Sequence, residues 1–120
     1  LYTCGDFDIQ TTIVEPLLRF TTKSIRTELS NNWFPNNVKL QPLFIRIKDF
    51  EADCRKFLNH FNEGLNEKAK VFSFKLLSCV FEGQNLVKPP DMSDFWIDFN
   101  LGSNSISVYY AFNDNQVIRL

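Results

Sequence analysis

The stretch that decides the fold runs from Phe95 to Phe112 and reads FWIDFNLGSNSISVYYAF. Apolar residues recur at every second position on both sides of a Gly-Ser-Asn break, and a β-strand gives this period because its side chains alternate between two faces. Gly, Ser and Asn are residues that tolerate a tight turn. The stretch therefore predicts an antiparallel hairpin with one apolar, core-forming face, made of Phe95, Ile97, Phe99, Leu101, Ile106, Val108, Tyr110 and Phe112.

The chain after this hairpin predicts a third strand. Asn113-Asp114-Asn115 has turn composition, and residues 116–120 would complete a meander. The opposite face of the hairpin carries Trp96, Asp98 and Tyr109. Asp98 is interpreted as a charge on a solvent-facing strand, which discourages edge pairing; the alternative is a carboxyl whose pKa is raised beside the indole.

Four further elements are expected upstream. Alternating apolar residues before Pro16 predict a strand over 6–14 followed by a helix to Ser30, and a single kinked helix over 9–30 is the competing interpretation. Residues 30–37 predict a loop and 43–47 a strand. A helix is expected from Asp49 to Gly64, with a buried stripe formed by Phe50, Cys54, Phe57, Leu58, Phe61 and Leu65.

Residues 70–83 are apolar at both odd and even positions, which is typical of a central strand covered on both faces. Together these elements predict an α+β fold: an antiparallel sheet of four to six strands with one or two helices packed on it, in a single compact domain over residues 1–120. The first residue is Leu rather than Met, so we expect the domain to be excised from a longer chain.

Composition favours an intracellular protein whose small net charge gives it no preference for highly charged partners. The 13 Lys and Arg residues nearly balance the 14 Asp and Glu residues, leaving a net charge of −1 and no overall field that would attract nucleic acid. Three cysteines without a CxxC pair favour a reducing cytoplasmic or nuclear compartment, although an oxidised pair stays open. No stretch reaches the roughly 18 apolar residues of a membrane span.

Motifs of catalysis are missing from the sequence. His60 is the only histidine, and helical spacing from Cys54 turns the two side chains to different sides, so His60 is interpreted as an exposed helix residue. Phe72 and Phe74 beside lysines loosely match an aromatic platform for nucleic-acid bases, but they are interpreted as residues of a core strand. We assign no catalytic residue, no metal site and no cofactor.

Surface recognition is the function that the sequence favours. Trp33 and Phe34 stand between Asn pairs, where large rings are out of place unless they pack on the core or contact a partner. Trp96 and Tyr109 lie on the less apolar hairpin face, and both residue types are enriched at binding hot spots. The prediction is a non-enzymatic protein-protein interaction or assembly domain, with a protein partner or self-association through these four residues. The alternative is a small apolar ligand in a Phe-lined pocket beneath the helices; an enzyme or a nucleic-acid-binding domain ranks below both.

Overall fold

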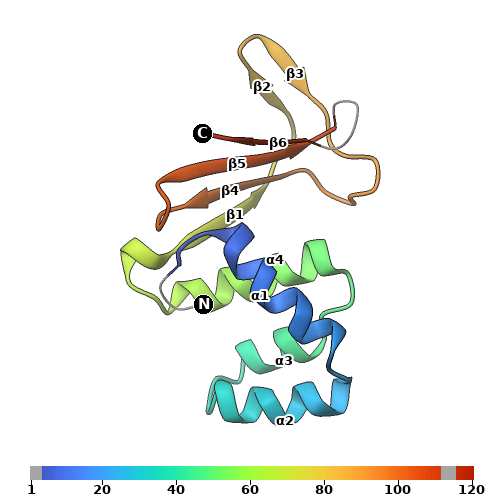
Figure 1. The fold of residues 1–120 in the computed structure, drawn as a ribbon, viewed down its shortest axis with the longest axis vertical. Helices are drawn as coiled ribbons and strands as arrows, with labels where there is room; N and C mark the ends of the chain where they lie inside the picture. The colour runs from blue at the N-terminus through green and yellow to red at the C-terminus, as the bar shows by residue number, and fades with distance from the viewer. Residues whose placement is uncertain (1–3, 112–115) are drawn as a thin grey trace.

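The computed structural model describes residues 4–111 and 116–120, and it arranges the chain as a helical layer joined to a sheet (Figure 1). The helical layer contains α1 (Phe7–Arg19), α2 (Lys23–Trp33), α3 (Leu40–Ile45) and α4 (Phe50–Glu63). After the short 3-10 helix η1 (Glu67–Ala69) come β1 (Val71–Lys75), β2 (Cys79–Phe81), β3 (Gln84–Leu86), β4 (Trp96–Asn100), β5 (Ser105–Tyr110) and β6 (Gln116–Arg119). In Figure 1, α4 lies between the sheet on one side and α3 on the other. The predicted α+β class is confirmed.

The first helix replaces the strand that was predicted over residues 6–14. The carboxylate of Asp6 caps α1 by accepting hydrogen bonds from the amides of Asp8 and Ile9, and this stabilises the first helical turn. The buried residues of α1 are Phe7, Gln10 and Val14, which follow a helical and not a strand spacing. The kinked helix over 9–30 is also wrong, because α1 ends at Arg19 and Thr22 caps a separate α2.

Two other segments of the helical layer differ from the prediction. The expected loop begins only at Phe34, because α2 continues to Trp33. The expected strand over 43–47 is instead the short helix α3, whose Leu40 amide donates to the side chain of Asn37. The Asn37 side chain thus stabilises the turn that leads into a helix, in a segment where Ile45 and Ile47 favour a strand.

The prediction for α4 is confirmed, including both of its ends. Asp49 accepts a hydrogen bond from the Ala52 amide at the N-terminus, and Gly64 is the C-cap. The apolar stripe of α4 faces a cluster of aromatic rings in which neighbouring ring centroids lie 5.4 to 6.4 Å apart. This cluster is the core of the helical layer and consists of Phe34, Phe44, Phe57 and Phe61.

The main sheet has the strand order β1-β4-β5-β6 and is antiparallel throughout. The predicted hairpin over 95–112 is confirmed as β4 and β5, with Phe99 opposite Ile106. The predicted third strand is confirmed as β6. The predicted turn at 113–115 and the placement of Phe112 lie outside the described residues.

The central strand predicted over residues 70–83 is wrong. β1 ends at Lys75 and is an edge strand, and residues 79–81 pair with 84–86 in a separate hairpin. That local pairing follows from the turn at Glu82 and Gly83, where both residues have positive φ (47° and 77°) as a two-residue hairpin loop requires. The apolar residues on both faces of this segment therefore do not indicate cover on both sides, and Leu77 is fully exposed.

The two faces of the sheet are reversed relative to the prediction. The face that packs against α1 and α4 carries mainly polar side chains, and Ser73, Asp98, Asn100 and Ser107 are all buried there. The apolar face expected to form the core points away from the helices, so that Phe72 and Phe74 are exposed. Alternation distinguishes the two faces of a strand, but which face is buried depends on the element that covers it.

Candidate interaction surfaces

The helical layer and the sheet meet around one buried cation, Arg55 of α4. Its side chain is fully buried, and Nη2 donates to the Asp98 carboxylate of β4 at 3.2 Å. Nη1 donates to the side chain of Glu51 at 2.9 Å. Three aromatic rings surround the guanidinium, with centroids at 4.2 Å for Phe7, 5.0 Å for Trp96 and 5.3 Å for Tyr109. Arg55 thereby joins both helices at this interface to two strands of the sheet.

Asp98 is an internal partner of Arg55, and its interpretation as a solvent-facing charge is wrong. Its side chain is fully buried, and it also accepts a hydrogen bond from the Ser73 hydroxyl. Burial raises the pKa of Asp98 above its usual value, while the nearby guanidinium and the Ser73 hydrogen bond oppose that rise. This side chain holds the two layers together and is not positioned for chemistry with a substrate.

A second set of contacts fixes the start of α1 against the hairpin. The Phe7 amide donates to Asn100 Oδ1 at 2.8 Å, and the Asp6 carboxylate accepts hydrogen bonds from Ser103 and Arg119. Gly102 donates its amide to the Gly5 carbonyl at 2.9 Å, in a backbone approach so close that a Cβ added to Gly5 would lie 2.6 Å from Gly102. The two layers are therefore connected at the middle of β4, through Asp98, and at its C-terminal end, through Asn100 and Gly102.

The outer face of the sheet is the first candidate surface. We define it as the apolar side chains that point away from the helices: Phe72, Phe74, Ile97, Phe99, Ile106, Val108, Tyr110 and Ile118. Phe72 and Phe74 are 36% and 54% exposed. Their rings stack with centroids 6.5 Å apart, and Phe74 contacts Phe99 edge to face. Val108 is only 6% exposed, so Phe72 and Phe74 are the accessible part of this face, and an exposed aromatic pair of this kind is a candidate contact surface.

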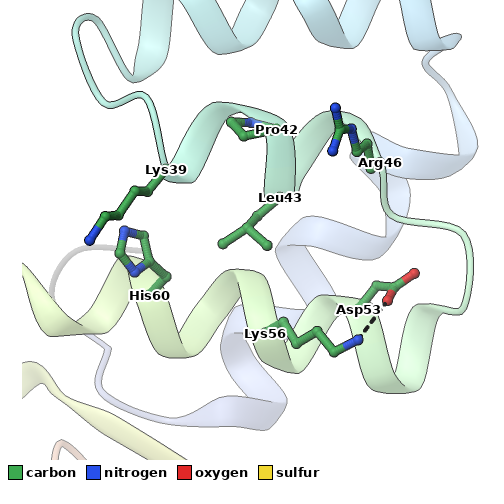
Figure 2. Close-up of a pocket in the computed structure, with 7 residues that line it drawn as sticks. All are labelled: Lys39, Pro42, Leu43, Arg46, Asp53, Lys56 and His60. Atoms are coloured by element: carbon green, nitrogen blue, oxygen red, sulfur yellow. Dashed lines mark ion pairs between the residues drawn. The ribbon is translucent and has the colours of Figure 1, made fainter.

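The second candidate surface is a groove of about 450 Å³ between α3 and α4. Figure 2 shows Leu43 pointing from α3 into the space between the two helices, with Lys39 and His60 at one end. Lys56 and Asp53 form an ion pair of 3.5 Å at the other end, near Arg46. Sequence reasoning missed this groove, because one of its walls is α3, which was predicted as a strand, and the other is α4.

The four residues predicted to form an interaction site do not come together. Trp33 is 42% exposed at the end of α2, and its ring contacts Phe34 and Phe44. Phe34 is buried in the aromatic core, 9% exposed. Trp96 and Tyr109 lie against Arg55 on the polar face of the sheet. Among these four, Trp33 thus presents the most accessible ring, while Phe34 and Trp96 serve internal packing.

The remaining candidates for chemistry are placed as follows. His60 is half-buried rather than exposed, and its Nδ1 lies 3.0 Å from Glu63. Cys54 is completely buried, and burial raises the pKa of its thiol to about 12. Within residues 4–111 and 116–120, no group of three or more His, Cys, Asp or Glu side chains is arranged to hold a metal ion. No helix among the same residues is long and apolar enough to cross a membrane.

Known proteins resemble this chain in both sequence and structure. Residues 71–119, from β1 to β6, match a family described as the Synaptonemal complex 2 Spt16M-like domain. Over 111 residues the chain is 47% identical to Synaptonemal complex protein 2 of Homo sapiens, an alignment that covers 89% of this chain and 7% of that protein. The chain resembles synaptonemal complex protein 2. Synaptonemal complex protein 2-like of Mus musculus is 41% identical over 113 residues, which cover 91% of this chain and 13% of that protein.

A solved structure described as a synaptonemal complex protein has the same fold. Its TM-score to this chain is 0.76 at 40% identity, and the match covers 98% of this chain and 31% of that one. The chain thus spans 7 to 13% of the length of these two curated relatives. The predicted function class, an interaction or assembly domain, is confirmed by this resemblance, and an intracellular location is consistent with it.

Proposed function

We propose that this chain is an assembly domain of a synaptonemal complex protein in the nucleus, and that it contacts other protein through the outer face of its sheet. The observation that carries the proposal is the reversal of the sheet: polar side chains pack on α1 and α4, and the apolar face points away from the helices with Phe72 and Phe74 exposed on it. Covering an apolar face of this kind with protein is favourable in water at about 25 cal/mol for each Å² buried.

The length of the relatives bears on what covers this face. Those proteins are many times longer than the chain, so the covering surface is available within one polypeptide as well as from a second molecule. Both sources are protein. In the isolated chain the face is free in either case, which makes the isolated chain a suitable probe of its tendency to associate.

The two other ligand classes fit the sheet less well. Phe72, Phe74 and Phe99 lie on an open face away from the helices, so they do not line a pocket for a small apolar ligand beneath the helices. For nucleic acid, cations beside the stacked rings are needed, yet Lys70 and Lys75 are paired with Glu67 and Asp94, each at 2.9 Å. We therefore propose a protein partner and not a small molecule or a nucleic acid.

The test compares the wild-type chain with a double variant, Phe72→Ser and Phe74→Ser. Light scattering over a range of concentrations should show association of the wild type, and the double variant should weaken it by more than about tenfold, as truncation of hot-spot aromatics does. Phe20→Ser is the matched control, because Phe20 is 85% exposed but lies at the end of α1.

Folding of each variant is checked by its urea midpoint, so that lost association is not confused with unfolding. The sheet assignment fails if the wild type stays monomeric and captures no protein partner at any concentration. It also fails if Phe20→Ser reduces association as much as the double variant does.

A further inference from the structure

We infer that the groove between α3 and α4 binds an acidic peptide segment that carries an apolar side chain. We call this groove the basic groove and define it by its lining residues: Lys39, Pro42, Leu43, Arg46, Asp53, Lys56 and His60 (Figure 2). It lies on the side of α4 opposite the sheet. The inference is therefore independent of the outer face of the sheet, and the two fail separately.

Charge is the first argument for an acidic occupant. The lining includes three cationic side chains and one carboxylate, a net charge of +2 with His60 neutral, although the whole chain carries −1. Lys39 and Arg46 are exposed, and neither forms an ion pair with any residue that the structure describes. These two side chains are thus available to the carboxylates of a ligand.

Asp53 does not neutralise these two cations, because its own surroundings already hold it. Its carboxylate accepts hydrogen bonds from the backbone amides of Lys48 and Asp49, both at 3.1 Å, and pairs with Lys56. The Lys48 amide is the main reason that the pKa of Asp53 lies below its usual value. Asp53 therefore orients Lys56 at one end of the basic groove and leaves Lys39 and Arg46 unneutralised.

The floor of the basic groove is the second argument, and it favours a peptide over a polynucleotide. Leu43 and Pro42 are half-buried and line the space between the helices, so an apolar side chain of a ligand can be buried there. None of the seven lining residues is a Phe, Tyr or Trp on which a base could stack. In a segment with Leu or Ile flanked by Asp and Glu, the apolar side chain can pack on Pro42 and Leu43, and the carboxylates can pair with Lys39 and Arg46.

The test uses a fluorescein-labelled peptide with a central Leu flanked by Glu and Asp, and measures its anisotropy on titration with the 120-residue chain. We expect saturable binding that weakens at least about tenfold in the double variant Lys39→Glu with Arg46→Glu, since reversal replaces two attractions with two repulsions. Binding should also weaken as salt is added, because the contacts are at the surface. Replacing the peptide's Leu with Ser should cost about tenfold as well.

The matched control is Lys23→Glu with Lys68→Glu, which changes the net charge equally at two exposed positions outside the basic groove. This variant should bind the peptide within about twofold of the wild type at moderate salt. Equal losses in the two variants would show that net charge alone governs binding and would overturn the inference. Tighter binding of a labelled single-stranded oligonucleotide than of the peptide, lost in Lys39→Glu with Arg46→Glu, would also overturn it.

Discussion

Replacing Asp98 with Asn should destabilise the fold strongly, because it removes the buried charge that faces Arg55. The Arg55 side chain is fully buried, and its other carboxylate partner, Glu51, is 46% exposed and contacts only Nη1. Arg55 would then keep a buried charge that is only partly compensated. Removing one partner of a buried ion pair lowers the free energy of unfolding by about 3 to 5 kcal/mol. This loss is a large fraction of the roughly 5 to 15 kcal/mol by which an ordinary domain is stable.

The same reasoning predicts that a double variant is less damaging than either single one. Arg55→Met should also cost about 3 to 5 kcal/mol, whereas Arg55→Met with Asp98→Leu removes both charges and should cost less than either single change. Removing Arg55 also removes its buried Nε, which has no hydrogen-bond partner in the structure. The measurement is the free energy of unfolding in urea for the four proteins of the cycle.

The exposed pair of Glu15 and Arg19 provides the control for this cycle. These side chains are 42% and 73% exposed and lie one helical turn apart, so Arg19→Met should change the free energy by less than about 1 kcal/mol. Losses below about 1 kcal/mol for both single variants at the buried pair would refute the reasoning. Strict additivity in the double variant would refute it too, because independent sites add and a coupled pair does not.

Three further predictions concern the core, acid stability and thiol reactivity. Phe57→Ala should lower the free energy of unfolding by about 3 to 5 kcal/mol, because its ring is 1% exposed within the aromatic core; a urea midpoint measures this. Although burial acts to raise the pKa of Asp6, its hydrogen bonds and Arg119 hold that pKa below its usual value. Its contribution to stability is thus complete above the ordinary carboxyl pKa of about 3.9 and is lost as the pH falls through the lower folded value. Urea titrations between about pH 5 and pH 2 should therefore show a smaller acid loss in Asp6→Asn than in the wild type. Because the Cys54 thiol is buried with a pKa of about 12, a mass-resolved alkylation experiment near neutral pH should modify Cys54 only after urea unfolds the chain.

The parts of the fold that the sequence predicted correctly are those with a clear period and clear ends. The hairpin of β4 and β5 has alternation on both sides of a turn, and α4 has an Asp cap, a helical stripe and a terminal Gly. The segment over residues 6–14 had alternation as well, but Asp6 caps a helix there through contacts to its own first turn. The N-cap residue indicates a helix and the period of two indicates a strand, and the helix is the structure that forms.

The candidate surfaces were less predictable because each depends on distant residues. Arg55 and Asp98 are 43 positions apart in the chain, and no local pattern indicates that they meet. A signal was present, since Arg55 lies in α4 beside the buried Cys54 and Asp98 lies two residues after the buried Trp96. Charges beside core positions on two elements predict a buried pair only when the elements are known to pack together.

The reversed sheet follows from this buried polar contact. A helix can cover only one face of β1 and β4, and α4 offers Arg55 and Asn59 toward the sheet, where they pair with Asp98 and Ser73. The opposite register would bury the phenylalanines but would separate the buried Arg55 guanidinium from Asp98. The hydrogen bonds of Asn59 go to the Ser73 backbone, so they do not distinguish the two faces. Matching polar partners fixes which face of the sheet meets α4. The apolar face then points away from the helices, which is the arrangement that the proposed contact with other protein requires.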